Sequence, residues 1–213
     1  MEKDSGKIKT HYIKVIIGKT SLINIYLNRE FNPSELSNTN LSQSFANFEL
    51  NDIKLNVSFW DTMGQEKYRS LTKTFIKGSN IVIFVYDITR IETLLELDYW
   101  LNTVIQEIGN DEVIFGVVGN KIDLFNECEV EQEEGKKYAS KIDALFCETS
   151  AKNNPKGFKY FIRQLLEQYL LKNKIVEKID ENENDRSFHL ENDNNNNEKN
   201  NYLKTKISTT SIK

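Results

Sequence analysis

The sequence predicts an α/β fold: a mostly parallel six-stranded sheet with one antiparallel strand and helices on both faces. Two patterns predict it. From about residue 8 to residue 172, apolar runs alternate with segments of helical periodicity, which is typical of strands joined by crossover helices. The runs 81–86 and 113–118 are continuously apolar and rich in β-branched residues, as expected of central strands buried on both faces.

Strands are expected where β-branched and aromatic residues gather in short runs. Two of these runs meet at Asn51-Asp52, which favours a hairpin. The predicted strands are residues 12–17, 45–50, 54–60, 81–86, 113–118 and 145–149.

Helices are expected where apolar residues recur at helical spacing. The segment that starts at residue 131 opens with acidic residues, which a helix N-terminus prefers. The predicted helices are residues 20–28, 94–108, 131–142 and 158–171.

Composition separates one domain from a tail. The chain has 213 residues, enough for a domain with a buried core over 8–172 and a tail over 173–213, with the last helix extending to about 179. Nine of the twenty residues from 182 to 201 are Asn. A stretch this polar buries too little apolar surface to offset the conformational entropy that it would lose on ordering. We therefore expect the tail to be disordered.

Charge and cysteine usage narrow the class of protein. The formal net charge of −4 does not indicate a basic surface for binding nucleic acid, so no nucleic acid is expected as a partner. Cys128 and Cys147 imply no disulfide framework and favour a reducing compartment. The N-terminus has no apolar signal region, and the run 81–86 is far too short to span a bilayer. We expect a soluble, cytoplasmic monomer.

The first segment with chemical content is Gly18-Lys19-Thr20-Ser21, which follows a predicted strand and opens a helix. There, backbone N–H groups and the helix dipole face a phosphate, Lys19 supplies a positive charge, and the Thr20 hydroxyl can ligate Mg²⁺. Taken alone, the segment is explained equally well as a turn at a helix start.

The second segment ends another strand with Asp61, followed by Gly64 and Gln65. An Asp in this position can hold Mg²⁺ through water, the Gly64 N–H can approach a γ-phosphate, and Gln65 can orient an attacking water. A strand-end turn is the alternative, since glycine serves many turns.

The third segment, Asn120-Lys121-Ile-Asp123, carries groups suited to guanine. The Asp123 carboxylate can accept hydrogen bonds from both donors of the Watson–Crick edge. Asn120 can pair with the Hoogsteen side, and the Lys121 stem can lie over the ring. Chance is the alternative in a chain rich in Asn, Lys and Asp.

The fourth segment, Ser150-Ala151-Lys152, follows the strand 145–149 and can bring a backbone N–H to the guanine O6. An ordinary helix N-cap serine is the alternative. All four segments follow predicted strands, and ligands of open α/β sheets bind where parallel strands end. Together they favour a site for a guanine nucleotide and Mg²⁺ over coincidence.

On these residues the sequence resembles the Rab branch of the Ras superfamily of small GTPases. The segments that carry the resemblance are WDTMGQEKYRSL, VYDIT, GNKIDL and ETSAK, and the similarity covers about residues 12–170. It implies a P-loop NTPase G domain that binds GTP or GDP with Mg²⁺, and a switch whose loops are released on GTP hydrolysis. Lys19 and Gln65 would be the catalytic residues.

The resemblance also implies roles for residues outside these four segments. Family spacing leads from Lys19 to Phe31 as the aromatic beside guanine. Thr39 is the candidate for the switch I threonine that closes over Mg²⁺, with Asn40 as the other possible alignment.

Effectors, an exchange factor and a GTPase-activating protein are implied as partners, with a role in vesicle and membrane trafficking. Binding to the cytosolic face of endomembranes would occur through such partners. The resemblance also implies three aromatic residues that face effectors: Phe45, Trp60 and Phe75. For Trp60 and Phe75, simple packing of the switch region is an equally good explanation.

The chain departs from the family at the phosphate-binding loop. The family pattern is G-x-x-x-x-G-K-[ST], whereas Ile17 directly precedes Gly18-Lys19, so about six residues are missing relative to a typical Rab protein. Those residues line a concavity of N–H donors around the phosphates, and each lost charge-assisted hydrogen bond costs about 1.5–3 kcal/mol.

Two explanations of this gap stay open. Either the chain is a pseudo-GTPase, a protein-binding module with weak or no nucleotide binding, or the sequence lacks a short piece of a normal gene. The intact Asp61, Gln65, Asn120 and Asp123 favour the second, and a transcript read across Ile17–Gly18 decides. The family's C-terminal prenylation cysteines and a Met-Gly start are also absent, so no encoded lipid anchor is expected.

Overall fold

A computed structural model describes residues 10–17, 22–23, 43–50, 53–61, 76–109, 113–153 and 155–176. The chain divides into a unit of residues 1–178 and a second unit of residues 179–213, and every described residue belongs to the first. The tail residues after 176 lie outside the described parts of the chain, so the expected disorder of the tail stays a prediction.

Six strands form one sheet in the order β2-β3-β1-β4-β5-β6. β2 runs antiparallel to β3, with Leu50 opposite Ile53, and the other described pairs are parallel. The predicted six-stranded sheet with one antiparallel strand is confirmed. The strands are β1 (Thr10–Ile17), β2 (Gln43–Leu50), β3 (Ile53–Asp61), β4 (Ile81–Asp87), β5 (Ile114–Asn120) and β6 (Leu145–Thr149).

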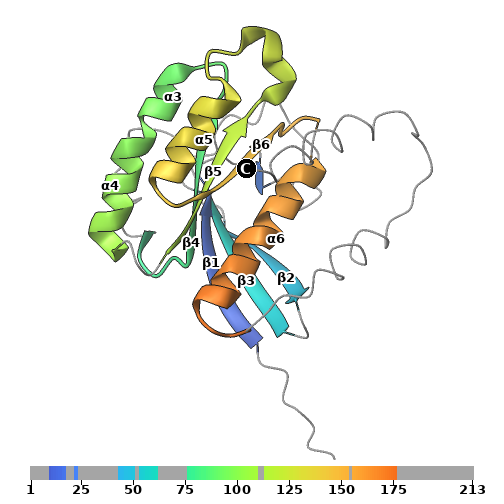
Figure 1. Ribbon diagram of the computed structural model, residues 1–213. Helices are drawn as coiled ribbons and strands as arrows, with labels where there is room; N and C mark the ends of the chain where they lie inside the picture. Colours follow the sequence, from blue (N-terminus) through green and yellow to red (C-terminus); the bar gives the residue numbers. More distant parts are fainter. Residues whose placement is uncertain are drawn as a thin grey trace, which may run out of the picture. The chain divides into compact units, whose positions relative to one another are not determined.

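Helices lie on both faces of the sheet, as predicted (Figure 1). On one side are α3 (Ile91–Leu95), α4 (Leu97–Ile108) and α5 (Gln132–Lys141), and on the other is α6 (Pro155–Lys172). None of the described helices has the length and apolar character needed to cross a bilayer.

Three helical details refine the expectation. The helix expected over 94–108 is divided into α3 and α4 at Glu96. A short 3₁₀ helix, η2 (Ile122–Glu127), is not foreseen, because it buries none of its residues and so leaves no apolar period in the sequence. The helix expected over 20–28 is described at Leu22 and Ile23, which are helical and buried.

The acidic start of α5 forms a capping box. The Glu131 side chain accepts a hydrogen bond from the backbone three residues on, and Glu134 Oε2 accepts one from the Glu131 N–H at 2.9 Å. Two backbone donors that the helix leaves unpaired are thereby satisfied, which explains why the helix begins here.

Two apolar clusters fill the spaces on either side of the sheet. β4 and β5 lie between them and are buried along their whole lengths, which explains their continuously apolar sequences. From α3 and α4, Leu94, Leu97 and Val104 enter one cluster. The α6 residues of the other cluster follow the helix period: Phe158, Phe161, Ile162, Leu165, Leu166 and Leu170.

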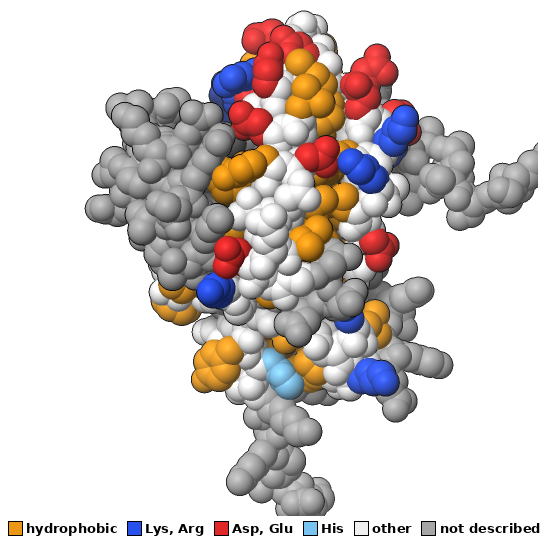
Figure 2. Space-filling model, turned by 90° about the vertical axis from the view of Figure 1, so that its left-hand side faces the viewer, with side chains coloured by type: hydrophobic (Ala, Val, Ile, Leu, Met, Phe, Trp, Pro, Cys, Tyr) orange, Lys and Arg blue, Asp and Glu red, His pale blue; other side chains and the backbone are white. Residues whose placement is uncertain are grey.

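The outer surface of α3 and α4 is viewed in Figure 2. Acidic side chains gather toward the upper end of this face, and apolar side chains lie between the charged ones. Leu95 and Tyr99 are among the exposed apolar residues of these two helices. Since the buried side chains of the same helices enter the core, the helices are amphipathic.

Candidate guanine nucleotide site

Polar side chains end the parallel strands at one edge of the sheet. In the strand register Asp87 of β4 is the partner of Asn120 of β5, and Asn120 is the partner of Thr149 of β6. Ser150 follows directly, so β4, β5 and β6 place their last residues side by side. This is the edge at which open α/β sheets bind ligands.

The side chain of Asn120 joins two of the predicted segments. Its Oδ1 accepts a hydrogen bond from the Ala151 N–H at 3.1 Å, and Asn120 is buried. Because a backbone N–H can only donate, this contact identifies the amide oxygen and leaves Nδ2 as a donor for another partner.

Ser150 joins the same two segments through its hydroxyl. Oγ donates to Asp123 Oδ1 at 2.5 Å and accepts from the N–H groups of Lys152 and Asn153 at 3.1 and 3.0 Å. A hydroxyl has one donor and two acceptor sites, so these contacts use its full capacity. They hold the Asp123 carboxylate in a defined orientation.

The backbone donors of this loop are already used within the protein. The Ala151 N–H donates to Asn120, and the Lys152 N–H donates to Ser150 Oγ. A guanine O6 at this position would therefore share the Ala151 N–H in a three-centre hydrogen bond or displace Asn120 from it. The sequence alone does not reveal this competition.

Lys121 adopts a left-handed backbone conformation, with φ of 71°, between Asn120 and η2. Its Nζ lies 2.5 Å from Oδ2 of Asp87, and its side chain is 48% exposed while that of Asp87 is 9% exposed. The ammonium group is thus tied to the end of β4, and the apolar stem remains partly accessible to a ligand.

Asp87, in the segment VYDIT, is a site residue for which the sequence predicted no role. Burial alone would raise the pKa of its carboxyl group, but hydrogen bonds from Lys121 and Thr89 and the charge of Lys121 outweigh burial, so the pKa is lowered. The available signal was a carboxylate that ends a fully apolar strand run, at the same edge as the other motifs.

Asp61, the predicted magnesium-binding carboxylate, ends β3 and is 6% exposed. It is the register partner of Ile17, the last residue of β1, and Leu22 is already helical and buried. The predicted phosphate-binding residues directly follow Ile17 in the sequence, and Ile17 lies beside Asp61. Between Asp61 and Asn120 the strand order places β1 and β4, about 14 Å in three strand spacings.

Several predicted site residues lie outside the described parts of the chain, so their roles stay predictions. They comprise the phosphate-binding and catalytic groups, one switch I ligand and two aromatics, namely Gly18, Lys19, Thr20, Ser21, Phe31, Thr39, Gly64, Gln65 and Phe75. The structure brings together Asn120, Lys121, Asp123, Ser150 and Ala151, and it places the exposed Lys152 directly after them.

The predicted effector aromatics that are described differ in their surroundings. Phe45 of β2 is 69% exposed and lies opposite Ser58 of β3. Trp60 is half-buried: it packs against the core, its Nε1 donates to Ser58 Oγ at 3.2 Å, and Lys14 Nζ lies 4.8 Å from its ring centroid. Packing therefore largely explains the presence of an aromatic residue at position 60, whereas it does not explain the exposed aromatic residue at position 45.

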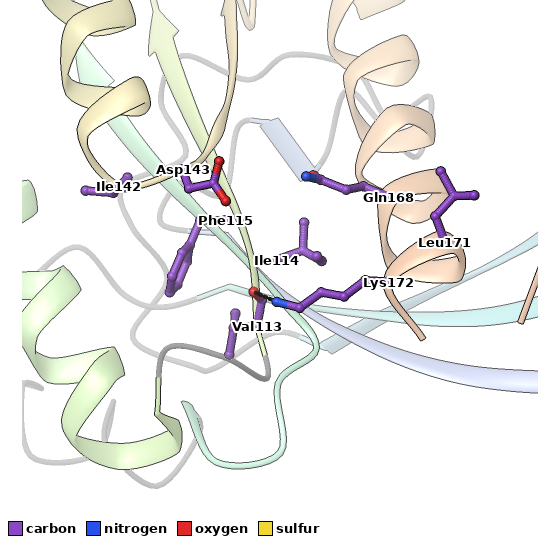
Figure 3. Close-up of a pocket in the computed structure, with 8 residues that line it drawn as sticks. All are labelled: Val113, Ile114, Phe115, Ile142, Asp143, Gln168, Leu171 and Lys172. Atoms are coloured by element: carbon purple, nitrogen blue, oxygen red, sulfur yellow. Dashed lines mark hydrogen bonds between the residues drawn. The ribbon is translucent and has the colours of Figure 1, made fainter. Parts of the chain in front are cut away.

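A cavity of about 680 Å³ lies at the opposite edge of the sheet, where β5 begins (Figure 3). Gln168 extends from α6 toward it, and Lys172 Nζ donates to the Val113 carbonyl oxygen at 3.1 Å. None of the predicted site residues lines this cavity. It is therefore separate from the site at the strand ends.

The mixed sheet, the helices on both its faces and the polar strand ends together define an α/β domain of the nucleotide-binding class. Comparison with known proteins agrees: the sequence model of the Ras family matches residues 14–170, so the chain belongs to the Ras family. It is 38% identical over 138 residues to Ras-related protein Rab-17 of Mus musculus, covering 65% of this chain and 64% of the relative. Against human Rab-17 the identity is also 38% over 138 residues, covering 65% of each chain.

These matches confirm the resemblance to the Rab branch and the P-loop GTPase fold. Ras and Rab proteins are GTP hydrolases that bind GTP or GDP with Mg²⁺ and work with regulators and effectors, and the predicted class of enzyme agrees with this family. The chain spans less than two thirds of the length of these relatives.

Proposed function

We propose that this chain is a guanine nucleotide switch that binds GTP and GDP with Mg²⁺, hydrolyses GTP and acts in membrane trafficking. One observation carries the proposal: the Asn120–Ala151 and Ser150–Asp123 hydrogen bonds join two loops into one polar site. Preorganised polar groups bind with less loss of entropy than groups that must first be ordered.

The chemistry of this base site distinguishes guanine from adenine. Guanine offers two neighbouring donors, N1–H and the N2 amino group, to which a carboxylate can bind. Asp123 has a second oxygen beyond the one that Ser150 occupies, and a carboxylate has about four acceptor sites in total. Adenine has an acceptor, N1, in place of the N1–H, which leaves the partly buried carboxylate poorly paired.

The phosphate chain would lie toward β1 and β3. Asp61 is suited to hold Mg²⁺, because carboxylate oxygen is a ligand that Mg²⁺ prefers and because Asp61 ends its strand beside Ile17, which the predicted phosphate-binding residues directly follow in the sequence. When bound, Mg²⁺ would neutralise charge on the phosphates. In this proposal Thr20 and Thr39 supply further oxygens, Lys19 binds the phosphates and Gln65 orients the water.

The effector surface is proposed to include Phe45, whose exposure packing does not explain. A large aromatic side chain on a sheet surface is a typical anchor in protein interfaces. Trp60 contributes to the same surface through its partly exposed ring. Exchange factor, activating protein and effectors are the proposed partners, and they would recruit the chain to the cytosolic face of endomembranes.

Titration with a fluorescent GDP analogue tests the proposal. We expect saturable binding in the presence of Mg²⁺, weaker binding after EDTA is added, and displacement by GDP and GTP but not by ADP or ATP. Purified Asp98→Asn protein is a suitable control, because Asp98 is exposed and belongs to none of the motifs. Absence of binding at high micromolar protein would refute the switch.

A second function, a pseudo-GTPase that only binds proteins, is favoured by the sequence that follows β1. The strand extends to Ile17 and Gly18-Lys19 follows it directly, so the residues that the family pattern places before this Gly-Lys pair are missing. Loss of several phosphate contacts would lower nucleotide affinity by orders of magnitude. The same titration separates the two functions, since the pseudo-GTPase predicts no magnesium-dependent binding.

A further inference from the structure

Asp87 and Lys121 form an ion pair at the rim of the base site. Nζ of Lys121 lies 2.5 Å from Oδ2 of Asp87, and Asp87 is the register partner of Asn120, the residue next to Lys121. The contact therefore spans adjacent strand ends and links β4 to the loop that carries Asp123. Charge-assisted contacts with one buried partner are stronger and better ordered than contacts between two exposed groups.

The orientation of the Asp87 carboxylate is set independently of Lys121. Oδ1 accepts hydrogen bonds from the Thr89 N–H at 3.0 Å and from Thr89 Oγ1 at 2.7 Å. With Oδ1 held by Thr89, Oδ2 is directed to Lys121. The Asp87 N–H in turn donates to Thr93 Oγ1 at 2.9 Å, so the backbone at this strand end is also anchored.

The backbone of Lys121 is fixed, so the freedom that remains at this residue is that of its long side chain. Lys121 is one of the few non-glycine residues of the described chain with positive φ, and its carbonyl oxygen accepts from the Leu124 N–H at 2.8 Å. The four-carbon stem of lysine has many rotamers, and ordering it costs conformational entropy. The ion pair restricts these rotamers before a ligand arrives.

We propose that Asp87 is a positioning residue that holds the Lys121 stem in place against the guanine ring. This inference rests on the proposed function, because it assigns Asp87 to the same base site. Asp87 itself does not touch the nucleotide in this arrangement. It acts through Lys121, whose ammonium it binds at the far end of the stem.

The variant Asp87→Asn isolates this role. Asparagine has nearly the same shape, and its oxygen can still accept from Thr89, but an amide NH₂ replaces the oxygen that faces Lys121. We expect affinity for the fluorescent GDP analogue to fall roughly tenfold, mainly through faster dissociation, because the ordering of the stem must then be achieved on binding.

A second variant, Lys121→Met, keeps an apolar stem but removes the ammonium group. It should lose about as much affinity as Asp87→Asn, and it carries the test if Asp87→Asn does not fold. The double variant is the decisive comparison: if Asp87 acts only through Lys121, Asp87→Asn has no further effect in the Lys121→Met background. A purely structural role of Asp87 would instead weaken binding in both backgrounds.

Asp98→Asn is the matched control, since Asp98 pairs with Lys141 at 3.3 Å and both side chains are more than half exposed. Its affinity should stay within about twofold of the wild type. The inference is overturned if Asp87→Asn also stays within twofold, or if the two losses multiply in the double variant. If the wild type itself binds no analogue, the proposed function fails first and the positioning role fails with it.

Discussion

The Ser150 hydroxyl donates a 2.5 Å hydrogen bond to the Asp123 carboxylate and so joins two loops separated by 27 positions in the sequence. The same hydroxyl accepts from two backbone N–H groups of its own loop. One atom therefore aligns the carboxylate that would read guanine with the loop that follows β6. A substitution of Ser150 alone should therefore disturb both loops.

Replacing Ser150 by Ala should weaken both the base site and the fold. Ser150 is 1% exposed, and three hydrogen bonds are lost together. We expect the free energy of unfolding to fall by about 1–2 kcal/mol and nucleotide affinity to fall as well. Urea denaturation and analogue titration measure the two effects. Ser140→Ala, at an exposed position, should change neither.

Replacing Asp123 by Asn should change which base is preferred. An amide presents a donor as well as an acceptor, so it pairs better with xanthine, which has a carbonyl oxygen where guanine has the amino group. Competition of XDP and GDP against the fluorescent analogue checks this. A variant that still prefers GDP by the wild-type margin would show that Asp123 does not read the base.

Replacing Gly135 by Ala should destabilise the protein although alanine favours helices. A Cβ at this position of α5 would overlap Tyr86 Oη and would lie 2.7 Å from the Phe146 ring. Overpacking of this kind costs about 1–3 kcal/mol. Thermal denaturation should show a smaller loss when Tyr86→Phe is combined with it, because the closest atom is then gone. Lys137→Ala, exposed on the same helix, is the control.

Acidification should remove the contribution of Asp87 to stability. Burial would raise its pKa, but the bonds from Lys121 and Thr89 and the Lys121 charge lower it below the unfolded value of about 3.9. The unfolded chain then takes up the proton first, so the contribution is complete above that value and is lost as the pH falls through the folded pKa. The difference in unfolding free energy between wild type and Asp87→Asn should be constant from pH 7 to 5 and shrink below about pH 4.

The two cysteines should differ in reactivity. Burial, with a smaller contribution from Glu148, raises the pKa of the Cys147 thiol to about 12, whereas Cys128 is exposed. Since the thiolate is the reactive form, iodoacetamide should modify Cys128 in the native protein and Cys147 only after denaturation. Peptide mass spectrometry locates the label. Equal native labelling of both thiols would contradict the described packing of β6.

The sequence by itself determined the strand and helix order, the mixed sheet and the residues of the base motif. The order of elements follows from local periodicity. The base motif follows from residue types whose chemistry is known from the sequence, such as those of the Asn120–Asp123 segment. It did not place the break at Glu96 or η2, because neither changes the apolar pattern that a reader of the sequence can follow.

Only the tertiary structure decided which side chains meet. Asp87 and Lys121, or Ser150 and Asp123, become partners because the register of β4, β5 and β6 brings their last residues level. Register depends on packing across the whole sheet rather than on any one segment. For the same physical reason, the register places Ile17 beside Asp61, at the ends of β1 and β3.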